Sequence, residues 1–375
     1  MRKYVLIPDS FKGTMSSLDV CRIVTDAILS QEPDAAVCAI PVADGGEGTV
    51  DAFLSAVGGQ RIPVNCTGPY GEPITACYGL LPDGTAVVEM AAAAGLPMVG
   101  EHRNAERTTT YGVGQLIVHA ARHGARQIVL ALGGSATNDG GAAAAVGVRF
   151  LNAAGKAFVP VGATLKDVAR IDTAAMDEAV RRVPFTTMCD IDNPLCGPTG
   201  ASAVFGPQKG ADAAMVRRLD DGLRQLAGVI RRDLDCDVLD LPGGGAAGGF
   251  GAGAAAFFRS PLRMGIDVVL SLTAFDRRAA DADLVITGEG KLDSQSLRGK
   301  VVIGVARRAK ALGVPVAALV GASELDVAAA YAVGVSGIFP INPAPAPFDQ
   351  VKPLCRAHLR FTAENLIRFF RAVHP

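Results

Sequence analysis

The sequence has no tryptophan among its 375 residues, and aromatic residues make up only 5% of it. It also has no apolar run that approaches the roughly 18 residues of a membrane-spanning helix, so we expect no membrane span. Its 36 basic and 37 acidic residues give a formal net charge of -1. That balance offers no electrostatic reason to bind nucleic acid or an anionic membrane, and we expect neither partner.

Cysteine patterns that would indicate a metal site are missing as well. None of the eight cysteines forms a CxxC pair or lies at zinc-ligand spacing from a histidine. In a chain of this length they are typical of reduced, mostly buried thiols, which favours a cytoplasmic location. The apolar run at 4–7 ends at Pro8 and is too short for a signal peptide, which agrees with that location.

Several catalytic signatures are absent too. There is no Walker A sequence, because the pair Gly299 and Lys300 is followed by Val301, and there is no HRD sequence of a protein kinase. The segment GFGAG at 249–253 matches a dinucleotide-binding loop only weakly. No GxSxG elbow occurs, and the five histidines lie away from the glycine-rich turns, so catalysis by a covalent triad is poorly supported.

What the sequence does contain is glycine, with 44 residues, and proline, with 22, beside a hydrophobic fraction of 49%. These numbers predict many short loops between small-residue helices and strands that bury sizeable cores. The length suits two domains better than one.

The most informative stretch, RQIVLALGGSATNDGGAAAAVGVRFL at 126–151, is typical of a strand, a turn and a helix. The apolar run at 128–132 predicts a strand covered on both faces. The turn that follows contains Gly133, Gly134, Ser135, Thr137, Asn138 and Asp139. A helix from Ala142 would aim its free N–H groups and positive dipole end at this turn. The pattern predicts a site for phosphate and magnesium, and the alternative is that these side chains only cap the helix.

Alternating strands and helices occupy the first sixty and the last ninety residues, whereas short strands around tight turns follow from about residue 61. We therefore predict an α/β fold of two domains. A discontinuous flavodoxin-like parallel α/β/α domain would comprise residues 1–60 and 280–375. An inserted, mixed α/β domain would comprise residues 61–279, with the active site in the cleft between the two.

Acidic residues and lysines recur where expected strands end in glycine-rich turns, the edge at which an open parallel sheet binds ligands. They are Asp9, Lys12, Asp44, Glu47, Asp139, Asp190, Asp192, Asn193, Glu289 and Asp293, with Lys209 and Lys300 beside glycines. Each alone would be a cap or a solvated charge, but so many strand ends with such turns favour one shared function. Phosphoryl transfer suits them, because it needs magnesium, cations that hold phosphate and a carboxylate that takes a proton.

The motifs together resemble the glycerate kinase type-1 family. They are PDSFKG at 8–13, PVADGGEGT at 41–49, GGSATNDGG at 133–141, CDIDNPL at 189–195, FGPQKGA at 205–211, PGGGAAGG at 242–249 and VITGEGKLDSQS at 285–296. The resemblance covers essentially the whole chain in the right order. It implies phosphorylation of D-glycerate by ATP with Mg2+, at the 2-hydroxyl in the bacterial group, within glycerate, glycolate and sugar-acid catabolism.

The turns and the resemblance lead to candidate roles for individual residues. The candidate catalytic residues are Asp190, as the base for the acceptor hydroxyl, Lys12 and Asp44. The candidate substrate-binding residues are Asp9, Ser10, Arg103, Asn193 and Lys209. The expected ATP-binding residues are Gly133, Gly134, Ser135, Thr137, Asn138, Gly245 and Gly248. The candidate metal ligands are Asp139 and Glu289.

Two alternatives stay open at this point. The residues do not decide which hydroxyl accepts the phosphate, so a glycerate 3-kinase that yields 3-phosphoglycerate is the first. A nucleotide-binding regulatory module without turnover is the second, although the many carboxylates speak against it. The expected partners are D-glycerate and ATP, and whether the chain forms a homodimer is open.

Overall fold

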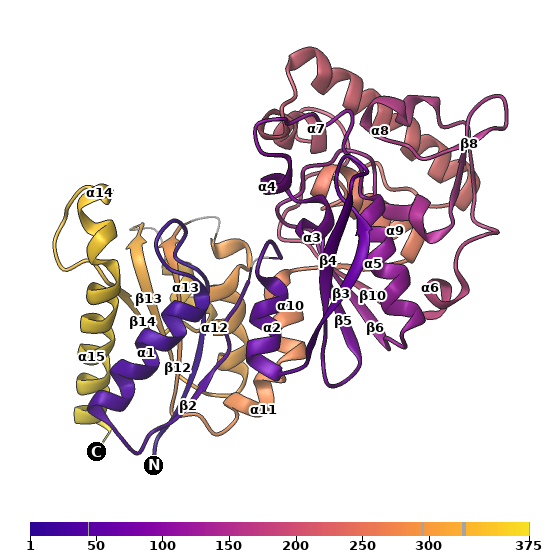
Figure 1. Cartoon of the computed structure of the whole chain (residues 1–375). Helices are drawn as coiled ribbons and strands as arrows, with labels where there is room; N and C mark the ends of the chain where they lie inside the picture. Colours follow the sequence, from indigo (N-terminus) through magenta and orange to yellow (C-terminus); the bar gives the residue numbers. More distant parts are fainter. Residues whose placement is uncertain (44, 294–295, 325–327, 375) are drawn as a thin grey trace. The chain divides into compact units, whose positions relative to one another are not determined.

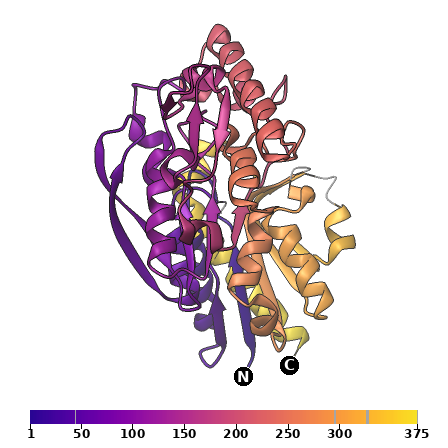
Figure 2. The same ribbon diagram turned by 90° about the vertical axis from the view of Figure 1, so that its right-hand side faces the viewer.

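The protein is described by a computed structural model that covers residues 1–43, 45–293, 296–324 and 328–374 (Figures 1 and 2). The chain divides into two compact units. Unit 1 comprises Met1–Asp44, Ser55–Val57 and Met264–Pro375, and unit 2 comprises Gly45–Leu54 and Gly58–Arg263. Among the described residues, no helix has both the length and the apolar character that crossing a membrane requires.

Unit 1 contains a five-stranded parallel sheet in the order β14-β13-β12-β1-β2. Its strands are β1 (Lys3–Pro8), β2 (Ala36–Ala39), β12 (Leu284–Leu292), β13 (Val316–Ser323) and β14 (Gly337–Pro340). Counted within the unit, this is the flavodoxin order 2-1-3-4-5, which confirms the predicted class. The order reverses between β1 and β12, where a sheet of this kind binds its ligands.

The helices of unit 1 cover this sheet. They are α1 (Ser17–Gln31), α10 (Gly265–Leu272), α11 (Phe275–Ala279), η4 (Ser296–Arg298), α12 (Val301–Ala311), α13 (Ala328–Val333), α14 (Phe348–Val351), η5 (Lys352–Leu354) and α15 (Cys355–Val373). Apolar residues of α1 and α15 form one core with the residues that β1, β12 and β13 turn toward them (Figure 1). Both chain ends lie in this unit (Figure 2). Arg2 donates a hydrogen bond there to the carbonyl of His374.

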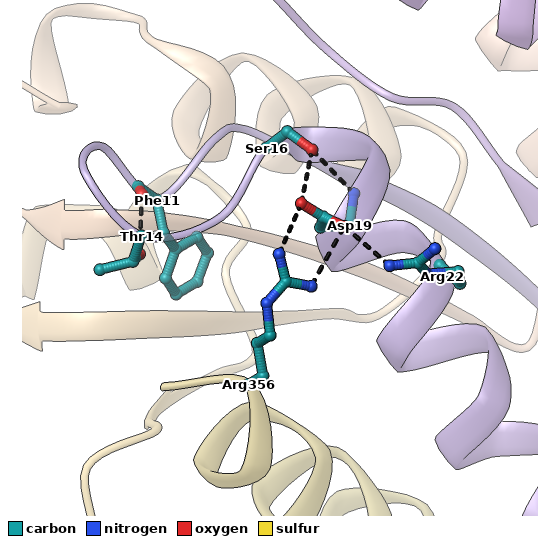
Figure 3. Close-up of polar contacts among 6 residues, drawn as sticks. All are labelled: Phe11, Thr14, Ser16, Asp19, Arg22 and Arg356. Atoms are coloured by element: carbon teal, nitrogen blue, oxygen red, sulfur yellow. Dashed lines mark hydrogen bonds and ion pairs between the residues drawn. The ribbon is translucent and has the colours of Figure 1, made fainter. Parts of the chain in front are cut away.

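Helix α1 begins where Ser16 caps it, because the Ser16 Oγ accepts a hydrogen bond of 3.1 Å from the Asp19 N–H. The Arg356 guanidinium donates two hydrogen bonds to the Asp19 carboxylate, at 3.1 and 2.9 Å (Figure 3). These bonds are the main reason why the pKa of Asp19 falls to about 2. The fork therefore ties the start of α1 to the start of α15.

Unit 2 contains a mixed sheet in the order β11-β10-β6-β5-β4-β3 and a small antiparallel sheet in the order β8-β7-β9. The mixed sheet consists of β3 (Gln60–Thr67), β4 (Pro73–Leu80), β5 (Thr85–Glu89), β6 (Gln127–Ala131), β10 (Phe185–Met188) and β11 (Leu262–Arg263). The small sheet consists of β7 (Arg149–Leu151), β8 (Ala157–Phe158) and β9 (Arg170–Asp172). Strands β3, β4 and β5 pair antiparallel, as their turns predict, whereas β5, β6, β10 and β11 are parallel.

The helices of unit 2 are mostly short. They are α3 (Ala91–Ala94), α4 (Leu96–Val99), α5 (Tyr111–Arg122), η1 (Ala142–Val146), η2 (Gly162–Asp167), α6 (Glu178–Arg182), α7 (Ala201–Phe205), η3 (Pro207–Lys209), α8 (Ala213–Leu234) and α9 (Ala246–Phe258). Helix α2 (Thr49–Val57) contributes residues to both units. The carboxyl ends of β5, β6 and β10 meet at one edge of the mixed sheet, which positions the turns discussed below.

The unit boundaries differ from the expected ones at both crossings. Residues 264–279 belong to unit 1, because α10 and α11 pack there: Ile266 lies against Gly304, and Asp276 binds Arg308 at 2.7 Å. Residues 45–54 belong to unit 2, where Gly45 accepts a hydrogen bond of 2.7 Å from the Gly133 N–H.

The prediction of a regular helix from Ala142 is wrong. The structure has the five-residue 3-10 helix η1 there, which ends at Gly147 with φ of +91°. Gly140 and Gly141, with φ of +73° and +114°, keep the chain from entering a regular helix after the turn. A single short 3-10 turn does not supply the dipole end that the sequence suggested.

Candidate active site

The turn after β6 lies inside unit 2 and is held on several sides by backbone hydrogen bonds. The Gly134 carbonyl accepts from the Leu96 N–H at 2.7 Å, and the Ala136 N–H donates to the Ala94 carbonyl at 2.9 Å. The Gly134 backbone has φ of +76°, which favours glycine there. The four polar side chains of the turn, Ser135, Thr137, Asn138 and Asp139, are all buried. The polar turn predicted from the sequence is thus real, but its side chains are directed into the unit.

Lys209 holds this turn from the end of η3. Its buried Nζ donates hydrogen bonds to the Ser135 Oγ at 3.0 Å and to the Thr137 carbonyl at 2.6 Å. Burial lowers the pKa of Lys209 to about 7, and the nearby Asp139 opposes that shift. The ammonium group is therefore a bonded part of the turn in this structure, not a solvated cation.

Asp139 has two carboxylate oxygens in different situations. Its Oδ2 accepts hydrogen bonds from the Thr110 N–H at 2.6 Å, the Thr110 Oγ1 at 2.8 Å and the Thr109 Oγ1 at 3.3 Å. Its Oδ1 is buried and has no hydrogen-bond partner within the described part of the chain. Burial raises the pKa of Asp139 to about 6, against the effect of the Thr110 bonds. One oxygen is thus structural, and the other is a buried acceptor to which no described residue donates.

The glycine-rich segment 242–249 packs directly against the turn. A β-carbon at Gly248 would lie 2.0 Å from the Thr137 carbonyl oxygen, so the two backbones touch and only glycine fits. Gly245 donates its N–H to the Asn193 carbonyl at 3.0 Å. Asn138 exchanges hydrogen bonds with Ser202 at 3.3 and 3.4 Å. The expected ATP-binding glycines at 245 and 248 therefore serve close backbone packing in this structure.

Asp190 follows β10 and is partly exposed at the same sheet edge. Three residues later, the Asn193 Nδ2 donates to the Thr199 carbonyl at 2.8 Å and shapes the loop. The neighbouring Cys189 is buried, which raises the pKa of its thiol. A thiol of this kind is a poor nucleophile, so the carboxylate of Asp190 is the reactive candidate at this strand end.

Arg103 is exposed and already engaged with backbone carbonyls. Its Nε donates to the Gly100 carbonyl and its Nη1 to the Gln208 carbonyl, both at 3.1 Å. A β-carbon at Gly210 would lie 2.3 Å from the Arg103 carbonyl oxygen, so the loop that contains Arg103 touches the segment that contains Lys209. A substrate carboxylate would have to share or replace the two carbonyl bonds.

In unit 1, Asp9, Ser10 and Lys12 follow β1 at the point where the strand order reverses. The Asp9 N–H donates to the Gly288 carbonyl at 2.8 Å, and its carboxylate accepts from the Ser10 N–H at 2.6 Å. Lys12 is exposed within a turn that is closed by Phe11 and Met15, and the Thr14 hydroxyl donates to the Phe11 carbonyl at 2.8 Å (Figure 3). The turn is therefore a formed structure that presents Lys12.

Glu289 lies inside β12, which extends beyond the expected strand end, and its side chain is buried. Burial raises the pKa of Glu289 to about 7, a hydrogen bond with Ser296 opposes this, and the charge of Asp9 adds to it. The Oε1 atom is buried without a hydrogen-bond partner among the described residues, as is Asp139 Oδ1 in unit 2. Glu289 and Asp9 therefore lie close together at the β1/β12 edge.

The remaining candidate, Asp44, lies outside the described residues. The structure also shows a buried carboxylate beside a cavity that the sequence analysis did not single out. Glu89, at the end of β5, is a buried carboxylate that accepts from the Val50 N–H at 2.5 Å, and burial raises its pKa. It lines a cavity of about 380 Å³ together with Arg61 and Asp51, which bind each other. The sequence signal that could have identified this residue is its position, because Glu89 directly follows the apolar run at 86–88.

Two α/β units with polar turns at the carboxyl ends of parallel strands place the protein among the α/β enzymes that bind ligands at such edges. Residues 4–371 match the family model described as the glycerate kinase family. The chain therefore belongs to the glycerate kinase family, which confirms the resemblance of its motifs. It is an enzyme, a kinase, and membership of a kinase family implies ATP as the co-substrate.

Relatives that match over the whole chain agree with this placement. A protein of Bacillus cereus named glycerate kinase is 43% identical over 368 residues, which cover 97% of each chain. A protein of Escherichia coli named glycerate 2-kinase is 40% identical over 370 residues, which cover 96% of this chain and 97% of the relative. The crystal structure of a Salmonella typhimurium protein described as glycerate kinase 2 superposes with a TM-score of 0.87 at 42% identity. It covers 100% of this chain and 99% of its own.

Proposed function

We propose that the protein transfers the γ-phosphoryl group of ATP to the 2-hydroxyl of D-glycerate and yields 2-phosphoglycerate, in glycerate, glycolate or sugar-acid catabolism. The observation that carries this proposal is the whole-length match to glycerate kinases, one of which is named a 2-kinase. The eight cysteines are all free thiols, which supports a cytoplasmic location. A site in the cleft between the two units stays a prediction.

The donor set fits a magnesium ion in part. Asp139 Oδ1 and Glu289 Oε1 are buried carboxylate oxygens without a hydrogen-bond partner in the described ranges, and hard oxygen ligands are what Mg2+ prefers. No group of three metal-ligating side chains occurs among those residues, but Mg2+ bound with ATP needs only one or two carboxylates. We propose Asp139, in unit 2, and Glu289, in unit 1, each as a candidate for such a ligand. Bound Mg2+ would neutralise charge on the phosphates.

The chain's own residues would then position the acceptor and the phosphates. Asp190 is the proposed base, which takes the proton of the 2-hydroxyl as the new O–P bond forms and ADP leaves. Lys12, exposed in the turn after β1, is placed to neutralise an anionic group. Lys209 is bonded to Ser135 and Thr137, which supports a role in holding the phosphate-side turn rather than in gripping substrate.

The carboxylate of glycerate has to be fixed so that one hydroxyl is presented. Asp9 and Ser10, at the strand-order reversal, can accept from and donate to substrate hydroxyls. Arg103 can grip a carboxylate in bidentate fashion if it releases its carbonyl partners. Asn193 shapes the loop that follows Asp190.

The deciding experiment measures ADP release from ATP with D-glycerate and Mg2+, followed by phosphorus NMR of the product. We expect turnover that depends on D-glycerate and a signal of 2-phosphoglycerate, with L-glycerate as the control substrate. A signal of 3-phosphoglycerate would make the protein a 3-kinase. ATP binding without ADP release would indicate a regulatory module.

A further inference from the structure

Helix α15 has a second apolar face that does not contribute to the core of unit 1. Its core face consists of Cys355, Leu359, Ala363, Leu366 and Ile367. The other face, which we call the α15 outer face, consists of Leu354, Phe361, Asn365, Phe369 and Val373. Their spacing of seven, four, four and four residues places them on one side of a helix.

The α15 outer face is exposed to an unusual degree. The side chains of Leu354, Phe361 and Phe369 are 51%, 55% and 64% exposed. Phe348, in the adjacent α14, is exposed as well. Among the described residues, the exposed phenylalanines are Phe348, Phe361 and Phe369. Scattered apolar residues on a surface are ordinary, but exposed apolar residues that align on one side of a helix mark an interaction site.

We propose that the α15 outer face is a self-association surface, through which two copies of the chain pair their α15 helices antiparallel about a twofold axis at Asn365. Asn365 lies four residues from Phe361 and four from Phe369. An axis through it places Phe361 of one copy against Phe369 of the second copy, and the reverse, as an isologous interface requires. The two Asn365 amides then meet each other at the centre, where a polar residue fixes the register of paired helices.

Charge at the rim of the α15 outer face is also self-complementary. Glu364 binds Arg360 at 3.0 Å but Arg368 only loosely, at 3.8 Å. Arg368 donates to Gln31 of α1 at 3.0 Å. In the antiparallel arrangement Glu364 lies within about one helical turn of Arg368 of the second copy, so two equivalent ion pairs form across the axis where Arg368 exchanges Gln31 for that carboxylate.

A membrane surface is the other occupant that an amphipathic helix can bind, but three of the four arginines of α15 do not favour it. Such helices direct their basic side chains outward beside the apolar face. Here Arg356 binds Asp19 (Figure 3), and Arg368 and Arg371 donate to Gln31, all on α1, which runs alongside α15 (Figure 1). The polar Asn365 in the middle of the stripe also suits a helix partner better than lipid.

Sedimentation velocity of the full chain over about 1 to 100 μM tests the proposal. We expect a dimer, and we expect Phe361→Glu and Phe369→Glu each to raise its dissociation constant by at least about tenfold. Val159→Glu, at a residue that is 50% exposed in unit 2, is the matched control and should leave the dimer intact. Circular dichroism would show that each variant is folded. A wild-type chain that stays monomeric over this range refutes the proposal.

The register is tested by cross-linking. Under mild oxidation Asn365→Cys should form a covalent dimer much faster than wild type, because the two thiols meet on the axis. Arg360→Cys is the control, since its thiols would lie about ten residues apart along the pair and stay reduced. Equal cross-linking of both variants would contradict the register. Binding of the monomer to phosphatidylserine vesicles, lost in Phe361→Glu, would assign the α15 outer face to a membrane instead.

Discussion

Replacement of the buried Lys209 by methionine probes how the turn after β6 is built. Burial holds the pKa of Lys209 at about 7, whereas the ordinary value is 10.5. Between these two pH values the unfolded chain binds a proton that the folded chain has released. The unfolded state then holds more protons, so the free energy of unfolding rises with pH in this window.

The magnitude follows from linkage. One such group adds about 1.4 kcal/mol of stability per pH unit when the folded state has lost the proton completely, which holds from about pH 8 to pH 10. Lys209→Met removes this contribution. It also leaves the buried Thr137 carbonyl without the Lys209 donor, which costs about 1–3 kcal/mol. The difference in unfolding free energy between wild type and variant should therefore grow by up to about 3 kcal/mol from pH 8 to pH 10.

Urea unfolding at a series of pH values measures this difference. Circular dichroism follows the whole chain, and labelling of the buried Cys66, identified by mass spectrometry, reports on unit 2 separately. Thiols and tyrosines that titrate at high pH cancel, because both proteins contain them. Lys156→Met, at an exposed lysine of unit 2, is the control for the loss of one lysine. If the difference for Lys209→Met grows no more with pH than the difference for Lys156→Met, our description of the turn is wrong.

Four further outcomes are expected. Gly134→Val should abolish ATP binding in calorimetry and, since φ there is +76°, should also lower the urea midpoint; unchanged ATP affinity would exclude the turn as the nucleotide site. Asp190→Asn should lower kcat by about 10²-fold or more, and near-normal kcat would exclude it as the base. Arg103→Lys should raise KM for glycerate more than KM for ATP. Arg356→Met should lower the urea midpoint at pH 7, and this deficit should shrink as pH falls from 3.8 toward 2, where Asp19 loses its charge in the folded state.

The fold of unit 1 was largely predictable, because it depends on local signals. Apolar runs such as 4–7 predict buried strands, and Ser16 marks the start of α1. Alternation of strands and helices then leaves few topologies. The unit boundaries were less accessible, since residues beside a crossing pack against partners that are distant in sequence. The Gly45 carbonyl, for example, accepts a hydrogen bond from the Gly133 N–H.

The sequence identified the candidate residues of the site but not the contacts that hold them. The turn at 133–139 was identified by its composition, yet its burial depends on Thr110 and Lys209, which lie some 30 and 70 residues away. The periodicity of apolar residues in the sequence does not predict contacts between residues so far apart. For the same reason Gly248 was interpreted as a glycine that faces ATP. In the structure, the Thr137 carbonyl occupies the space that a side chain at Gly248 would need.

The burial of this turn bears on the proposal that it holds the phosphates of ATP. Burying a polar group costs free energy unless it is hydrogen-bonded, and nearly every polar atom described in the turn is bonded within unit 2. A turn bonded in this way cannot relax when the charge on a phosphate changes, which is the condition for electrostatic preorganisation. Asp139 Oδ1 is the exception, since its sister oxygen accepts three donors while it accepts none in the described chain. Because the rest of the turn is bonded, we propose this one unsatisfied oxygen, rather than the surrounding hydroxyls, as the ligand of Mg2+.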